Sequence, residues 1–254
     1  MMDPEEGLAK DTKILSDGTF TIDGGMLVYG VPTFYGRSVE SHLKPLYIES
    51  GDERILVDCG IGDPPDKFRD AYGVKKETDL LDQLSKMGLS PDDITMVIQT
   101  HLHFDHTGYS RYFSSASFIC QEEEIRYAHM PDRFQKGAYI GENFRELRFR
   151  PVVGEREVAP GVTVIPTPGH TPGHQSVTVE KDDEVLVYTG DVTPLPVNYE
   201  KRFIVGVLHD PVKALRSIDL LRDISGWWPD KKKRFVFSHA RERGVGMLSE
   251  KEMK

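Results

Sequence analysis

Hydrophobic residues early in the chain predict two adjacent β-strands. The segments LKPLYIES (43–50) and ERILVDCG (53–60) are rich in apolar and β-branched residues. A short Ser-Gly-Asp turn separates them. Two such segments joined by a turn of this composition are typical of a β-hairpin.

Two later segments show helical spacing. From Thr78, apolar side chains recur at Leu80, Leu81, Leu84 and Met87, and Gly88 then supplies a stop signal. Asp210 followed by Pro211 predicts a helix start, because Asp caps the first turn and Pro fits the first helical position. Leu215, Ile218, Leu221 and Ile224 form the apolar face of that second helix, and EEEIRYAHM (122–130) predicts a short third one.

Further short apolar segments predict strands between and after these helices, at 94–100, 116–121, 161–169, 175–180, 184–191 and 234–240. Alternating strands and helices indicate an α/β fold, whereas hairpins require antiparallel pairing. Two mixed β-sheets packed face to face, with helices on the outer faces, satisfy both requirements. The sequence therefore predicts an αββα sandwich.

Composition supports one soluble globular unit. The chain has 254 residues, 38% hydrophobic and 29% charged, which excludes intrinsic disorder and low-complexity classes. We expect a single domain over residues 1–254, with the first ~12 residues as a flexible extension. The net charge of −9 argues against a nucleic-acid partner, and the basic residues Lys231–Arg234 are expected to form a solvated turn.

The location and redox state follow from features of the same composition. No apolar segment approaches the ~18 residues of a membrane span. The first residues show no basic region followed by an apolar one, so we expect no secretory signal and a cytoplasmic protein. Cys59 and Cys120 lie in apolar strand contexts and are expected to be reduced and inert. Trp227 and Trp228 are expected to pack in the core.

The segment THLHFDHTG (100–108) carries the strongest chemical signal. It places His101, His103, Asp105 and His106 directly after a predicted buried strand. Active sites of α/β sheets favour the carboxyl ends of strands. Imidazoles and carboxylates are ligands for Zn²⁺ and similar divalent ions. His101 and His103, two residues apart in an extended segment, can reach one ion, while Asp105 and His106 can reach a second.

Three more candidate ligands follow predicted strands. His170 lies in TPGHTPGH (167–174), Asp191 ends YTGD (188–191), and His239 ends FSH (237–239). Each is weak evidence alone, because a His or Asp after a strand is common. With the THLHFDHTG residues, they give five His and two Asp in the same topological position, which predicts a two-metal site.

In this order, the motifs THLHFDH, TPGH, TGD and SH resemble the metallo-β-lactamase superfamily of αββα hydrolases. ILVDCGIGD (55–63) is similar to the early Asp-Gly motif of that family, and the resemblance covers about residues 47–240. TPGHTPGHQS, the Asp-Pro helix and DGGMLVYGVP (23–32) resemble the N-acyl-homoserine-lactone lactonases within it.

The resemblance implies a ligand set. His101, His103 and His170 would hold one metal, Asp105, His106 and His239 the other, and Asp191 would bridge them with a water or hydroxide. Asp105 would also pass a proton to the leaving group. The ligand types suit two Zn²⁺ ions and are compatible with Fe, Mn or Co.

One position departs from the lactonase pattern. Those enzymes commonly carry a Tyr three residues after the bridging Asp, and Pro194 stands there. Because Pro194 has no hydroxyl donor, we expect some lactone or ester hydrolysis but inefficient turnover of homoserine lactones in the usual manner, unless Tyr199 replaces the donor. His174 and Asp58 are expected to support ligands rather than bind metal.

The expected function is hydrolysis of a small ester, lactone or related acyl substrate. A thioesterase of the glyoxalase II type and a phosphodiester hydrolase remain alternatives on the same metal centre. A di-iron redox protein and a non-catalytic metal-binding module are less favoured, because His103 occupies a position that is Glu in the redox proteins and all seven ligand positions are filled. We expect a small-molecule partner and no nucleic acid or membrane, with a homodimer as one alternative. Loops 24–40, 131–150 and 192–209 are expected to determine the substrate.

Overall fold

The computed structural model describes residues 8–9, 11–224 and 226–241. It contains two main β-sheets and a small two-stranded one. The first sheet has the order β1-β4-β5-β6-β7-β8, the second β13-β12-β11-β10-β9, and β2 pairs with β3. The strands are β1 Asp11–Ile14, β2 Thr19–Asp23, β3 Ser38–His42, β4 Leu46–Ser50, β5 Glu53–Val57, β6 Met96–Ile98, β7 Ser117–Gln121, β8 Phe149–Val152, β9 Arg156–Ala159, β10 Val162–Pro166, β11 Gln175–Glu180, β12 Glu184–Tyr188 and β13 Lys232–Val236.

Both sheets are mixed. The predicted hairpin is confirmed as the antiparallel pair β4 and β5, whereas β5, β6 and β7 run parallel. In the second sheet β10, β11 and β12 are antiparallel neighbours and β12 is parallel to β13. The carboxyl ends of β10, β12 and β13 therefore meet at one edge of that sheet.

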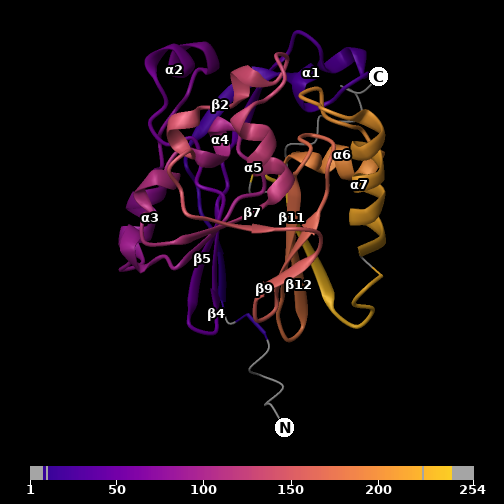
Figure 1. Cartoon of the computed structure of the whole chain (residues 1–254). Helices are drawn as coiled ribbons and strands as arrows, with labels where there is room; N and C mark the ends of the chain where they lie inside the picture. Colours follow the sequence, from indigo (N-terminus) through magenta and orange to yellow (C-terminus); the bar gives the residue numbers. More distant parts are fainter. Residues whose placement is uncertain (1–7, 10, 225, 242–254) are drawn as a thin grey trace.

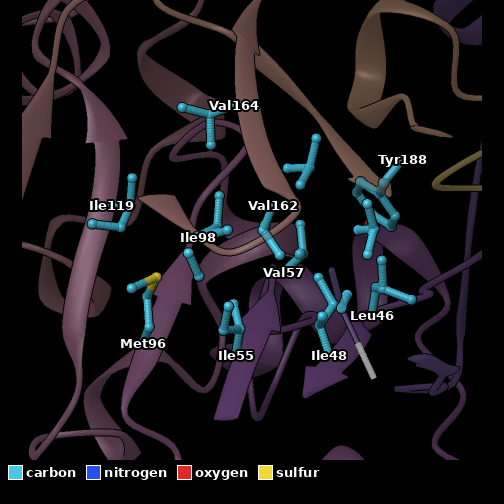
Figure 2. Packing of buried hydrophobic residues seen from close by; sticks show 14 of the residues in the cluster. Leu46, Ile48, Ile55, Val57, Met96, Ile98, Ile119, Val162, Val164 and Tyr188 are labelled. Atoms are coloured by element: carbon cyan, nitrogen blue, oxygen red, sulfur yellow. The ribbon is translucent and has the colours of Figure 1, made fainter. Parts of the chain in front are cut away.

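The sheets pack face to face through alternating side chains. Ile55 and Val57 of β5 point into the space between the sheets, and Leu56 points to the outer face. Leu186 and Tyr188 of β12 meet them from the second sheet. Figure 2 shows this inner layer, in which side chains of both sheets interdigitate. Burial on both faces explains why these strands form nearly continuous apolar segments in the sequence.

Helices cover the two outer faces (Figure 1). Leu80 and Leu84 of α3 pack on the first sheet, and Ile218, Leu221 and Ile224 of α7 pack on the second. The αββα sandwich is thus confirmed. The helices are α1 Gly24–Leu27, α2 Asp66–Tyr72, α3 Leu80–Lys86, α4 Phe104–Thr107, α5 Glu122–His129, α6 Pro196–Lys201 and α7 Pro211–Ile224, with 3-10 turns at Pro32–Phe34, Pro91–Asp93, Ser110–Tyr112, Lys136–Ala138, Gly141–Asn143 and Gly190–Val192.

Some local expectations differ from the structure. Lys232, Lys233 and Arg234 belong to β13 and not to a turn, because pairing with β12 extends to Lys232 opposite Glu184. Core packing is wrong for Trp227, which is 45% exposed, whereas Trp228 packs against the α7 cluster. Within the expected N-terminal extension, residues 1–7 and 10 lie outside the described residues, and β1 begins at Asp11.

Two other expectations concern the thiols and the membrane. Cys59 and Cys120 are buried and free, as expected. Burial is the main cause that raises the pKa of both thiols, so they stay protonated and unreactive. Of the helices in the described residues, none has the length and apolar content needed to cross a bilayer.

Candidate metal centre

The seven candidate ligands come from segments that follow four different strands. His101 and His103 follow β6, and Asp105 and His106 lie on α4 immediately after them. The other three lie past the ends of β10, β12 and β13, where Asp191 occupies the 3-10 turn Gly190–Val192. All seven are buried: His101, His103, Asp105, His106, His170, Asp191 and His239.

The side chains gather into two adjacent groups. The first group consists of His101, His103 and His170, and the second of Asp105, His106, Asp191 and His239. Within each group the candidate ligand atoms all lie within 4.8 Å of one another. The division is that of the two ligand sets that the resemblance implied, except that Asp191, the expected bridge, falls in the second group.

Ring nitrogens converge in the first group. His170 Nε2 lies 3.2 Å from His101 Nε2 and 2.9 Å from His103 Nδ1. Burial, reinforced by the neighbouring imidazoles, lowers the pKa of His101 and His103 well below the usual value. Burial also lowers the pKa of His170. The three rings are therefore neutral at pH 7, which is the form in which imidazole binds a metal ion.

Asp191 faces both groups. Its Oδ1 lies 3.2 Å from His106 Nε2, and its Oδ2 lies 3.2 Å from His239 Nε2. The same Oδ2 is 3.7 Å from His170 Nε2 in the first group. Asp105 Oδ2 lies 3.5 Å from His239 Nε2. One carboxylate is thus placed between the two sets of nitrogens, as a bridging ligand would be.

Charge is distributed differently in the second group. Burial lowers the pKa of His106 and His239, but the nearby carboxylates, chiefly that of Asp191, outweigh burial and raise both pKa values above the usual one. Burial would raise the pKa of Asp191, but these two histidines outweigh it and hold that pKa well below its usual range. A metal ion at this group would displace protons from the imidazoles.

Hydrogen bonds at Nδ1 fix the ring orientation of four of the five histidines among the candidate ligands. The Nδ1 atoms of His106, His170 and His239 donate to Asp58 Oδ2 at 2.8 Å, Val207 O at 2.7 Å and His42 O at 3.0 Å. His101 Nδ1 lies 3.0 Å from Thr100 Oγ1, whose hydroxyl donates to Asp58. With the Nδ1 proton used in this way, Nε2 of each ring faces its group.

The short distances between ring nitrogens suit a metal ion bound between the rings better than direct hydrogen bonds from ring to ring. In the first group, His101 Nε2 and His170 Nε2 both carry lone pairs once their Nδ1 atoms act as donors, yet they lie 3.2 Å apart. Two facing acceptors with no proton between them repel each other, and a cation between them removes the repulsion. Three imidazoles in one group, with imidazoles and carboxylates in the other, are a donor set suited to Zn²⁺ and other first-row ions.

Asp58 lies outside both groups and contacts His106 of the second, the arrangement that the expected supporting role requires. Its carboxylate accepts the Thr100 amide at 2.8 Å, the Thr100 hydroxyl, His106 Nδ1 and the Tyr188 hydroxyl at 3.2 Å. Asp58 has a φ of 58°, in the left-handed region. Asp and Asn visit this region more readily than other residues with a side chain, so the turn that follows β5 suits this residue type.

His174 holds the loop that carries Asp191. Its Nε2 accepts the Asp191 amide at 2.9 Å, and its Nδ1 lies 2.9 Å from the Thr167 hydroxyl. Burial lowers the pKa of His174 to about 3, so the ring is neutral and Nε2 can accept. The nitrogen needed for a metal bond is already used, which agrees with the supporting role expected for this residue.

A cavity of about 220 Å³ opens beside the two groups. His103, Asp105, His170, Asp191 and His239 lie on its wall. All three loops expected to determine the substrate contribute, through Met26 and Leu27, Phe134 and Gln135, and Pro194, Val205 and Val207. The other lining residues are Phe20, Ile22, Tyr72, Phe104, Gly137 and Ala138.

Two residues near the site were not expected from the sequence. Tyr72, at the end of α2, lines the cavity, and its ring centroid lies 5.2 Å from that of Phe104. Glu124 is fully buried next to the metal-site loops. Tyr199, in contrast, packs on Phe235 with 4.5 Å between ring centroids and is absent from the described residues that line the cavity.

Comparisons with known proteins agree with this geometry. Residues 46–226 match the family described as the metallo-beta-lactamase superfamily. Over 156 residues the chain is 35% identical to the N-acyl homoserine lactonase AttM of Rhizobium radiobacter, covering 58% of this chain. It is 32% identical over 189 residues to the N-acyl homoserine lactonase AiiA of Bacillus thuringiensis subsp. kurstaki, covering 70% of this chain and 74% of that protein.

The extent of these matches differs between sequence and structure. The chain spans only 59% of the length of the AttM relative. A solved N-acyl homoserine lactone hydrolase, with the product N-hexanoyl-L-homoserine bound at its catalytic metal centre, has a TM-score of 0.79 and 26% identity. That match covers 91% of this chain and 94% of the solved one, so the similarity extends over nearly the whole fold.

Proposed function

Because the chain belongs to the metallo-beta-lactamase superfamily, we propose that it is a dinuclear metal-dependent hydrolase that opens a lactone or a related acyl ester. One observation carries the proposal: seven buried His and Asp side chains converge in two adjacent groups, and Asp191 faces both. The proposed ligands are His101, His103 and His170 in the first group and Asp105, His106 and His239 in the second, with Asp191 shared.

When bound, two divalent ions would supply a hydroxide nucleophile at neutral pH and would withdraw charge from the substrate carbonyl oxygen. The protein residues have three tasks around that chemistry. Asp58, Val207 and His42 keep the imidazoles oriented through their Nδ1 atoms. The apolar part of the cavity wall excludes water and binds the acyl portion of the substrate. Asp105 takes up the proton of the attacking hydroxide and donates it to the alkoxide that leaves when the ester bond breaks.

A hydroxyl donor for the substrate carbonyl is the remaining requirement. Pro194 lines the cavity but offers none, and Tyr199 packs elsewhere. Tyr72 lines the cavity together with Asp105. Burial, followed by the negative charge of Asp105, raises the pKa of Tyr72, so its hydroxyl keeps the proton that it would donate. We propose that Tyr72 replaces the Tyr that lactonases carry at the position of Pro194.

The relatives favour lactones over the alternatives. The AttM and AiiA relatives are named N-acyl homoserine lactonases, and the solved relative holds an acyl-homoserine product. For this chain we propose lactone hydrolysis as the main activity. Thioesters of the glyoxalase II type and phosphodiesters remain substrates to be tested against it.

The test is a substrate panel on metal-quantified protein. Lactones, thioesters, phosphodiesters and β-lactams are supplied in parallel, with acid release followed by a pH indicator. We expect two metal ions per chain and the highest kcat/KM on a lactone. The matched variant is Asp191→Ala, which removes the shared carboxylate and should abolish turnover. One metal ion per chain at saturation, or lactone hydrolysis that survives in Asp191→Ala, would refute the proposal.

A further inference from the structure

A buried carboxylate outside the seven proposed ligands lies beside the first group. Glu124 is in the first turn of α5 and has no exposed surface. Its Oε1 accepts the Leu102 amide at 3.0 Å and the Tyr139 hydroxyl at 3.2 Å. Its Oε2 accepts the Thr171 hydroxyl at 2.6 Å and the Gly173 amide at 3.3 Å. The carboxylate therefore receives four hydrogen bonds.

The positions of these donors reveal what the carboxylate connects. Leu102 stands between His101 and His103 in the chain, and Thr171 follows His170 directly. One oxygen of Glu124 thus binds the loop after β6, and the other binds the loop after β10. These two loops carry all three residues of the first group. Glu124 holds them at a fixed separation, although they are remote in sequence.

Two further contacts make this connection tight. Tyr139 donates to Glu124 and packs its ring against His103, with 4.7 Å between ring centroids. A Cβ atom at Gly173 would lie 2.1 Å from the Glu124 amide nitrogen, so only glycine allows the loop to approach α5 this closely. Glu124 thereby orders both the backbone of the two loops and the ring that supports His103.

Burial of this carboxylate is unfavourable by itself. Its four donors are uncharged: two backbone amides and two hydroxyls. Removing a carboxylate from water costs free energy that neutral donors offset only in part. A carboxylate that stays buried beside three neutral imidazoles is suited to support binding of the cation that these imidazoles would hold.

The second group depends on other partners. His106 is held by Asp58, His239 by the His42 carbonyl, and Asp191 by His174 and the Ser238 hydroxyl at 2.7 Å. Asp58 reaches both groups, because Thr100 connects it to His101. None of the four hydrogen bonds of Glu124 involves a residue adjacent to a ligand of the second group. Its hydrogen bonds therefore act directly on the first group, and they reach the second only through Gly173, the residue before His174.

We propose that Glu124 is a positioning residue that selectively increases the metal affinity of the first group by fixing the distance between the His101–His103 loop and the His170 loop. This inference rests on the proposed function, because it assumes that the two groups hold metal ions. Residues that orient metal ligands typically change metal affinity by about 10–100-fold when they are replaced.

The variant Glu124→Gln tests the idea with little change in shape. An amide has one oxygen, so either the Leu102 amide or the Gly173 amide then faces an NH₂ group and loses its acceptor. We expect one of the two metal equivalents to bind about 10–100-fold more weakly and the other to remain within about threefold. The measurement is a Co²⁺ titration of metal-free protein, followed by visible absorption and competition with a chelator.

Two variants, each with one group impaired, show which of the two bound metal ions Glu124→Gln weakens. In His239→Ala, where the second group is impaired, the remaining high-affinity equivalent belongs to the first group and should be weakened by Glu124→Gln. In His103→Ala it belongs to the second group and should not change. Thr171→Val, which removes one donor and keeps the carboxylate, should give a smaller loss at the same equivalent. Circular dichroism confirms that each variant is folded.

The exposed neighbour Glu123 provides the control, since Glu123→Gln on the same helix should leave both equivalents unchanged. If the parent protein binds fewer than two Co²⁺ ions, the proposed function fails before this inference is tested. If the parent binds two and Glu124→Gln weakens both equally, or neither, the selective role of Glu124 is wrong.

Discussion

Replacing Asp58 by Asn should damage the metal centre without disturbing the backbone. Asn tolerates the left-handed φ of 58° found at this position, and the side chains have nearly the same shape. The carboxylate, however, accepts hydrogen bonds on both oxygens. Oδ1 accepts the Thr100 amide, and Oδ2 accepts both His106 Nδ1 and the Tyr188 hydroxyl.

The cost follows from this donor arrangement. If the NH₂ group replaces Oδ1, it faces the Thr100 amide, and if it replaces Oδ2, it faces His106 Nδ1. Either orientation leaves one buried donor without an acceptor, which costs about 1–3 kcal/mol. At about 2–4 °C per kcal/mol for a chain of this size, the Tm of metal-free protein should fall by roughly 2–12 °C.

Metal affinity should fall as well. Without an anionic acceptor for its Nδ1 proton, His106 loses the preference for the form that leaves Nε2 free. A decrease of about 10–100-fold in metal affinity is expected. Because Asp58 also orients His101 through Thr100, both metal equivalents should weaken, unlike in Glu124→Gln.

The assay combines scanning calorimetry of metal-free protein with a Zn²⁺ competition titration. Asp63→Asn, in the exposed turn after the same strand, is the matched control. The reasoning is refuted if Asp58→Asn retains metal affinity within about twofold of the parent, or if Asp63→Asn causes an equal loss. Asp58→Ala is a poorer test, because backbone strain and several unpaired donors would add to one another.

Three further predictions concern turnover and pH. Tyr72→Phe should lower kcat on lactones by about 10²-fold at unchanged metal content, while Tyr199→Phe should have no effect; equal kcat in parent and Tyr72→Phe would exclude the hydroxyl as donor. Asp105→Asn should suppress kcat more than metal content, because an amide can bind metal but cannot donate the proton; near-normal kcat with two metals bound would contradict the acid role. Burial raises the pKa of Asp17 to about 6 against the opposing effect of Lys76, so the folded protein favours the protonated side chain. The contribution of Asp17 to the free energy of unfolding is therefore complete below about pH 4 and is lost as the pH rises through 6. Denaturant unfolding should show a loss of a few kcal/mol across this range in the parent relative to Asp17→Asn, and parallel pH profiles would disprove it.

The strand-end positions of the candidate ligands could be predicted because each is encoded locally. A buried strand is recognised from a short apolar segment, and the residue at its end is read directly from the sequence. The segment 94–100 predicted β6 and placed His101 at its end, and 184–191 placed Asp191 after β12 in the same way. The shared orientation of the strand ends then determines that these residues meet.

The burial of Glu124 beside the first group could not be predicted, because it is not encoded locally. It lies in a sequence of three glutamates, and Glu122 and Glu123 on the same helix are exposed. Nothing in the local pattern separates the buried member from the others. Its burial results from contacts with loops 22 and 47 residues away in the chain, and only the packing of the two sheets brings those loops together.

Tyr72 illustrates the same limit for the cavity. The helix α2 has no buried residue, so its apolar pattern does not indicate which side faces the site. Its place is determined by ring contacts with Phe68 and Phe104, and Phe104 lies on α4 between two proposed ligands, His103 and Asp105. The residue types that bind metal are thus recognisable at strand ends, whereas the residues that orient them and shape the cavity depend on contacts between distant segments. A substitution at Glu124 or Tyr72 therefore tests the tertiary arrangement itself, which ligand substitutions at the strand ends do not.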